Sequence, residues 1–256
     1  DWTKSEINNF FEFKLDAFRI IISHYFNKKE LRKSLEYCKK VQMIDPFDSE
    51  INKFIVQIYR ELGEIDEAIR ELTELTENNP DNEIYWVLLA DLYANIKEYD
   101  KAIENYNKAI RLNSNYGIAY RNLGSTNKNI ASNIQKVEQE KLEKDKNYVI
   151  KKEEYFKPLG SAAEAFEKCL ETEDYRNNAE VLSELAQTYH VLDEVEKLNI
   201  TLAKLENIES QVPKTYLSKY YYNLLNIYSN RSKEGNNATK ASKINTKIEE
   251  LQKNGK

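Results

Sequence analysis

Two histidines and two cysteines are the residues of this 256-residue chain best suited to bind a metal ion or to act as a nucleophile. A zinc site needs three or four convergent ligands, usually supplied by paired motifs such as CxxC or HxxxH. His24 and His190 lie far apart in the sequence, as do Cys38 and Cys169, and none of them belongs to such a motif. We therefore expect partly exposed helix histidines and buried, unreactive thiols.

The remaining polar residues show no spacing typical of an active site. Gly124-Ser125 is an isolated pair and not part of a glycine-rich phosphate loop. A Ser-His-Asp arrangement would require contacts that the sequence does not supply. Glu138 and Glu140 lie in a charge-rich segment, where a solvated face is expected. The sequence therefore predicts no enzyme activity, no cofactor and no bound metal.

The composition favours long helices joined by short connections. Six glycines and four prolines are too few for the turns of a β-rich fold. Charged residues make up 32% of the chain, which suits helices with one buried and one solvated face. The net charge of −5 argues against a nucleic-acid partner. No apolar run approaches the roughly 20 residues of a transmembrane helix, so no membrane-spanning segment is expected.

The same residue classes recur every 34 residues. Tyr25, Tyr59 and Tyr93 form an aromatic column in this alignment. A second column holds small residues: Ser34, Ala68 and Ala102. Within each repeat the apolar positions follow helical spacing. Breaks such as that at Gly63 are short, so each repeat should be an antiparallel helix pair. Asp48 and Asn82 follow prolines and suit the N-caps of the next helices.

These columns resemble the tetratricopeptide repeat family, whose pattern is Trp-x2-Leu-Gly-x2-Tyr, then Ala-x3-Phe-x2-Ala, then Pro. The best match consists of Trp86, Leu89, Ala90, Tyr93, Ala102, Tyr106 and Ala109. The second consists of Ile55, Tyr59, Gly63, Ala68 and Pro80. The resemblance covers residues 15–125 and implies an all-α fold, a right-handed superhelical solenoid of about five to six antiparallel helix pairs.

We expect a single solenoid over residues 1–256. Its repeats should span about residues 15–48, 49–82, 83–116, 117–176, 179–212 and 214–253. The fourth contains an insertion at 128–156, interpreted as an extended helical hairpin with its bend near Lys146-Asn147. The outgoing helix should bury Ile130, Ile134 and Val137, and the returning helix Tyr148, Tyr155 and Ala162. Pro158 suits the first turn of the repeat's second helix, or a kink there.

The resemblance also implies a binding surface, because first helices of such repeats line a concave groove. The predicted partner-binding positions are Arg19, Ser23, Lys53, Gln57, Arg60, Asp91, Arg121, Ser125 and Lys128, with Ser183 and Gln187 at the matching positions of the fifth repeat. The five cations among them would favour an acidic ligand. A subfamily that clamps a partner's C-terminal carboxylate requires an amide where this chain has Leu88 and a second cation where it has Ser125. We therefore expect no such clamp.

The sequence thus indicates a non-enzymatic scaffold or adaptor that binds a protein or peptide through the groove or the projecting hairpin. Two alternatives stay open: a self-associating homo-oligomer paired through its hairpins, and an envelope-associated accessory lipoprotein that assists membrane-protein assembly or ligand uptake. The chain begins with Asp1 rather than Met, which leaves open a removed signal peptide or lipid anchor. The expected location is cytoplasmic, or periplasmic and membrane-anchored if such a segment was removed.

Overall fold

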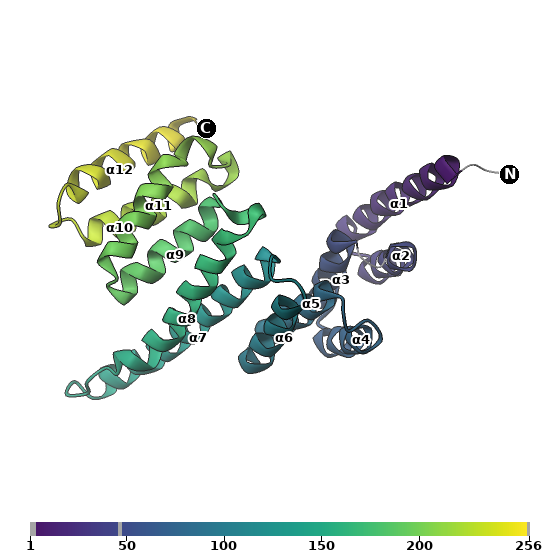
Figure 1. Ribbon diagram of the computed structural model, residues 1–256, viewed down its shortest axis with the longest axis horizontal. Coiled ribbons are helices and arrows are strands. Elements are labelled where there is room, and N and C mark those ends of the chain that lie inside the picture. Colours follow the sequence, from purple (N-terminus) through teal and green to yellow (C-terminus); the bar gives the residue numbers. More distant parts are fainter. Residues whose placement is uncertain (1–3, 46–47, 255–256) are drawn as a thin grey trace. The chain divides into compact units, whose positions relative to one another are not determined.

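The computed structural model describes residues 4–45 and 48–254, apart from the side chains of residues 4–12, Ser49, Lys53 and Asn254. Throughout this part the chain is helical, without a strand, which confirms the predicted all-α class. Its internal contacts divide it into two compact units, residues 1–114 and 115–256, which are described separately (Figure 1). The continuity of a single solenoid across both units stays a prediction.

The first unit consists of three consecutive helix pairs. They are α1 (Lys4–Asn27) with α2 (Leu31–Ile44), α3 (Ser49–Leu62) with α4 (Ile65–Asn78), and α5 (Glu83–Asn95) with α6 (Tyr99–Leu112). Asp48 and Asn82 begin the second and third pairs as predicted. The Asp48 carboxylate accepts hydrogen bonds from the backbone N–H groups of Glu50 and Ile51, and the Asn82 side chain accepts one from that of Ile84.

The turns inside these pairs repeat the same backbone conformation. Lys29, Gly63 and Lys97 have φ angles of 61°, 76° and 65°, in the left-handed region that ends many helices. Their spacing equals the sequence repeat. Glycine adopts this conformation without a steric penalty, whereas the two lysines do so at some cost. The three turns therefore share one backbone conformation, although only one of them contains a glycine.

A lysine ammonium lies near each ring of the tyrosine column that defines the repeat, from the second helix of the same pair at Tyr25 and Tyr93 and from α2 of the preceding pair at Tyr59. A lysine ammonium lies 5.3 Å from the ring centre of Tyr25, 5.9 Å from that of Tyr59 and 5.3 Å from that of Tyr93. In the second unit, lysine ammonium groups also lie over the rings of Tyr189 and Tyr228. Each of these rings therefore packs against its neighbours and also makes a cation–π contact with a lysine ammonium.

Ion pairs connect the first two helix pairs. Lys29 pairs with Glu61 at 2.8 Å and Lys39 with Glu71 at 3.0 Å. Arg32 pairs with Glu64 between them, and in each case the partners are 32 residues apart in the sequence. Exposed pairs of this kind contribute little to stability. The buried cluster formed by α1–α5, with Cys38, Val41 and Ile58 fully enclosed, therefore holds the unit together.

The second unit also consists of three helix pairs. They are α7 (Gly117–Lys144) with α8 (Lys152–Glu171), α9 (Ala179–Leu192) with α10 (Val195–Asn207), and α11 (Lys214–Asn230) with α12 (Asn237–Asn254). Short 3₁₀ turns at Glu173–Tyr175 and Glu209–Gln211 connect them. A cluster that includes Phe166, Leu198 and Tyr220 forms the core of this unit.

The hairpin formed by α7 and α8 extends beyond the other helices of its unit (Figure 1). Its turn, residues 145–151, includes the predicted bend. Near its base the two helices approach closely at Gly124, where an added Cβ would lie 2.6 Å from the Phe166 ring. Pro158 lies well inside α8, because the helix begins six residues earlier at Lys152. The interpretation of Pro158 as a first-turn residue was therefore wrong.

The apolar seam of the hairpin differs from the predicted one. Tyr155 and Ala162 are buried as predicted, whereas Val137 is 49% exposed and Ala131 and Leu159 are buried instead. The next position of the seam after Ile134 belongs to Glu138, which is only 3% exposed. The expectation that Glu138 lies on a solvated face was therefore wrong.

Glu138 is buried because three donors satisfy its carboxylate. The Lys141 ammonium, the Tyr148 hydroxyl and the Lys151 backbone N–H each donate to it at 2.8 Å. These hydrogen bonds lower the pKa of Glu138 to about 2, with the one from Lys141 contributing most. The Glu138 carboxylate thereby connects α7 to the turn that precedes α8.

Candidate protein-binding surface

The predicted binding residues of the first helix pair are partly engaged within the protein. The Arg19 guanidinium pairs with Asp48 at 2.7 Å and with Asp16 at 3.0 Å. The hydrogen bond to Asp48 is the main cause of the raised pKa of Arg19. Because Asp48 also caps α3, Arg19 links α1 to the start of the second helix pair. Ser23 is exposed one turn further along α1.

The predicted partner-binding residues of the second and third helix pairs differ in how accessible they are to a partner. Gln57 and Arg60 are exposed on α3, so both are accessible to a partner. The Lys53 side chain lies outside the described residues. Asp91 on α5 is half-buried and accepts a hydrogen bond from the Tyr106 hydroxyl on α6. Asp91 therefore joins the two helices of its own pair.

In the second unit, Arg121 and Lys128 lie beside acidic residues of the next first helix. Arg121 on α7 pairs with Glu180 on α9 at 2.9 Å, and Lys128 pairs with Glu184. Lys219 on α11 lies 3.7 Å from Glu180 and 4.0 Å from Glu184. The three first helices of this unit are thus connected by one network of charges, which we call the first-helix network.

The remaining polar groups of this face lie around the network. The Lys128 ammonium also donates to the Gln187 side-chain oxygen at 3.4 Å. Ser125 is half-buried on α7, four residues after Arg121. Tyr222 on α11 follows Lys219 by one turn and is 48% exposed, and its hydroxyl accepts a hydrogen bond from the Gln252 side-chain amide of α12 at 3.2 Å. Exposed tyrosines and arginines are frequent anchors at protein interfaces.

The sequence did not reveal Glu180, Glu184 or Lys219. The repeat alignment assigned Ser183 to this face, but Ser183 is 1% exposed and its hydroxyl donates to the Ala179 carbonyl oxygen at 2.7 Å. The 4,3 spacing of Glu180, Glu184 and Gln187 marks one helix face and was the available signal.

The basic groove predicted from five cations therefore needs correction. Arg19, Arg121 and Lys128 each pair with carboxylates, so their charges are largely balanced within the protein. Arg19 and Arg60 belong to the first unit, whereas Arg121 and Lys128 belong to the second. The second unit offers a surface of mixed charge in place of a purely basic one.

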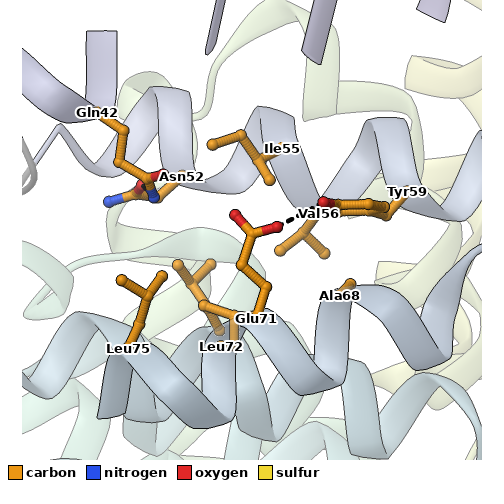
Figure 2. A pocket seen from close by; sticks show the side chains of 10 residues that line it. Gln42, Asn52, Ile55, Val56, Tyr59, Ala68, Glu71, Leu72 and Leu75 are labelled. Carbon is orange, nitrogen blue, oxygen red and sulfur yellow. Dashed lines mark hydrogen bonds between the residues drawn. The ribbon is translucent and has the colours of Figure 1, made fainter. Parts of the chain in front are cut away.

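A small cavity lies between α2, α3, α4 and α5 of the first unit (Figure 2). The Tyr59 hydroxyl donates to Glu71 at 2.5 Å, and the Gln42 amide donates to Asn52 at 2.8 Å. Leu88 also lines this cavity and is buried, so it does not face a ligand as the clamp amide would. The volume of about 10 Å³ suits at most one water molecule. The cavity is therefore a packing feature and not a ligand pocket.

The histidines and cysteines have the surroundings expected of structural residues. Cys38 and Cys169 are fully buried, and burial raises the pKa of each thiol to about 12. His24 is exposed and His190 half-buried, and desolvation lowers the pKa of His190. Over residues 4–45 and 48–254, His, Cys, Asp and Glu side chains form no group suited to a metal ion. Over the same ranges no helix has the length and apolarity of a membrane span.

Comparison with known proteins agrees with this architecture. Residues 55–117 match the family model described as tetratricopeptide repeat. In sequence, no curated protein matches the chain. Residues 55–117 therefore match the tetratricopeptide repeat family, and the helical-pair fold of the chain agrees with that match.

Solved structures of similar fold include one of MamA and one of PilF. A structure of MamA from Desulfovibrio magneticus RS-1, from residue 41 to its end, has a TM-score of 0.54 and 17% identity, covering 80% of this chain and 96% of that one. A structure of PilF from Pseudomonas aeruginosa has a TM-score of 0.58 and 14% identity, covering 94% of this chain and 93% of that one. At these identities the likeness concerns the fold alone.

Proposed function

We propose that this protein is a non-enzymatic scaffold that holds a protein or peptide partner on the face formed by its first helices. Tetratricopeptide-repeat proteins generally act as interaction scaffolds. Repeat arrays present an extended surface whose geometry is fixed by stacking of neighbouring repeats. A surface that is ordered before binding loses less conformational entropy when a partner docks.

The observation that supports this proposal most directly is the first-helix network of the second unit. Arg121, Lys128 and Lys219 are bridged by Glu180 and Glu184 across three helices. Side chains held in this way form a preorganised polar surface, and Tyr222, 48% exposed, lies one turn after Lys219 on α11. A partner with both acidic and basic groups would match the mixed charge of this face.

Site-specific photo-cross-linking tests which face binds. A photoreactive phenylalanine analogue replaces Gln187 on the first helix α9, and in a matched variant it replaces Ile200, which is 53% exposed on the second helix α10. We expect a discrete adduct with a partner from Gln187 and none from Ile200. Equal adducts at both positions, or an adduct at Ile200 alone, would contradict the proposed surface.

The contribution of Tyr222 provides a second measurement once the adduct is identified. Truncation of an aromatic anchor at an interface typically costs at least about 2 kcal/mol, or roughly thirtyfold in affinity. Tyr222→Ala should therefore weaken binding of that partner by about this factor, while the far-ultraviolet circular dichroism spectrum stays unchanged. Light scattering of the purified chain over a range of concentrations distinguishes this function from the alternative of self-association.

A further inference from the structure

The first helices α3 and α5 pack on the preceding helix pair with one particular side. Positions 34 residues apart occupy the same column of the repeat. The centre of the Phe54 ring on α3 lies 4.6 Å from that of the Phe26 ring on α1, and Leu88 on α5 lines the small cavity together with Ile55 of α3. Phe54 and Leu88 belong to one column, whose member on α1 is Ile20. We call this side of a first helix its stacking face.

The stacking face is buried on α3 and α5 but exposed on α1. Ile58 and Leu92 occupy its next column and are 0% exposed. On α1, Ile20 is 72% exposed, and His24, in the column of Ile58 and Leu92, is exposed as well. Phe13 lies two turns before Ile20 on the same side of the helix and is 74% exposed. The side that α3 and α5 cover against their neighbours is therefore open on α1.

Helix α1 consequently has apolar side chains on two opposite sides. Ile22 and Leu15 pack into the core of the unit, whereas Phe13 and Ile20 lie on the far side. A helix that is apolar all around is usually covered all around. Among the side chains that the structure describes, no other helix has two exposed large apolar residues on one side. The stacking face of α1 is therefore the surface that most requires a partner.

A second copy of the same face is the partner that the chain itself offers. The last helix, α12, exposes no large apolar side chain over residues 237–253, so a head-to-tail contact would place Phe13 and Ile20 against polar groups. An identical α1 presents apolar side chains at matching positions. Ala17 lies between Phe13 and Ile20, and its small side chain lets two helices cross closely.

The titratable groups of this face do not oppose such a pair. Asp16 and His24 lie one turn before and one turn after Ile20. Asp16 already pairs with Arg19 of its own helix at 3.0 Å. The face therefore carries no block of like charge that would repel a copy of itself. We propose that two copies of this chain pair through α1, as antiparallel helices related by a two-fold axis near Ala17.

The exposed area predicts a weak dimer. Phe13 and Ile20 together present roughly 250 Å² of apolar surface on each copy. Two copies would bury about 500 Å² of it, whereas a standard specific interface buries about 1,600 Å² in total. We therefore expect a dissociation constant of about 10–100 µM. The residues of the first-helix network take no part in this contact, so a dimer would present two copies of the network to a partner.

Sedimentation velocity tests this proposal. The full chain is measured from about 1 µM to about 500 µM, a range that brackets the expected dissociation constant. The face variant, Phe13→Gln with Ile20→Gln, should dimerise at least about tenfold more weakly, because the apolar contact is lost. The matched variant, Met43→Gln with Ile200→Gln, replaces two exposed apolar side chains elsewhere and should stay within about twofold of the unmodified chain. Circular dichroism confirms that each variant is folded.

A single introduced cysteine locates the contact. Ala17→Cys places a thiol near the proposed two-fold axis, where its counterpart in the second copy is within reach of a disulfide. Ser23→Cys, exposed on another side of α1, is the matched control. Cys38 and Cys169 are fully buried and do not compete. In an oxidising glutathione buffer, Ala17→Cys should form the linked dimer at least about tenfold faster than Ser23→Cys.

Three results would overturn the proposal. The first is an unmodified chain that stays monomeric up to about 500 µM. The second is a dimer that persists unchanged in the face variant, which would support the homo-oligomer paired through its hairpins. The third is an equal rate of disulfide formation for the two cysteines, which would indicate random collision. Light scattering of the face variant thus separates pairing through α1 from pairing through the hairpins. None of these measurements involves a partner bound to the first-helix network, so the proposed scaffold function is tested separately.

Discussion

Replacement of Gly124 by alanine tests the close approach of α7 and α8. The new Cβ would lie 2.6 Å and 2.7 Å from two atoms of the Phe166 ring, which has no exposed surface. The ring or a helix must shift, at a cost of about 1–3 kcal/mol in a close-packed core. Alanine favours a helix over glycine by about 1 kcal/mol. Gly124→Ala should therefore lower the free energy of unfolding by about 0–2 kcal/mol.

Gly160→Ala is the matched control. Gly160 lies inside α8, and apart from its chain neighbours and the adjacent backbone of its own helix nothing would lie within 4 Å of an added Cβ. This variant gains helix propensity without a clash, so its free energy of unfolding should rise by about 1 kcal/mol. Both variants gain the same helix propensity. The difference between their free energies of unfolding therefore measures the packing penalty alone, about 1–3 kcal/mol.

Urea unfolding followed by circular dichroism at 222 nm measures both variants. Two further variants, Phe166→Leu alone and Phe166→Leu with Gly124→Ala, complete a double-mutant cycle, and the smaller side chain should remove most of the alanine penalty. The reasoning fails if Gly124→Ala stabilises the protein as much as Gly160→Ala does. It also fails if the alanine penalty is the same with Phe166 and with leucine, because the ring would then not be the cause.

Three further predictions follow from buried polar and ionisable groups. The pKa of Glu138 is lowered from 4.5 to about 2, so its stabilising effect is present above pH 4.5 and is lost as the pH falls toward 2. Amide exchange in the turn between α7 and α8 should accelerate over that range, once corrected for intrinsic rates, and Glu138→Gln should abolish the dependence. Burial raises the thiol pKa values of Cys38 and Cys169 to about 12, so both should resist alkylation at pH 8 in the native protein. In urea both should react fully. Rapid labelling of the native protein would show that their burial is incomplete. Asp48→Ala removes the N-cap of α3 and should reduce stability by about 1–2 kcal/mol in thermal or urea unfolding.

The fold was predictable because the repeat constrains many positions at once. The columns of Tyr59 and Ala68 combine helical spacing with a fixed interval, and stacked helix pairs are the arrangement that buries such columns. The caps at Asp48 and Asn82 were predictable for a local reason, since a short polar side chain before a helix satisfies its first N–H groups.

Polar residues in buried or paired positions were not predictable in the same way. Glu138 continues an apolar seam, and the sequence does not show that Tyr148 and the Lys151 N–H converge on it from across a turn. The pairing of Arg121 with Glu180 depends on which faces of α7 and α9 meet, and an error of one helix position exchanges Glu184 for Ser183. Periodicity fixes which residues are apolar and inside, but it does not fix the partners of charged groups.

The extra length of α7 and α8 lies at the turn between these paired helices and not between successive pairs. A change in the length of both helices by whole turns would alter the hairpin without altering how α8 meets α9. The connection to the following repeat begins only after Glu171, at the base of the hairpin. Evolution or engineering can therefore vary the reach of this appendage, remove it or exchange its end while the downstream helices keep their order and spacing.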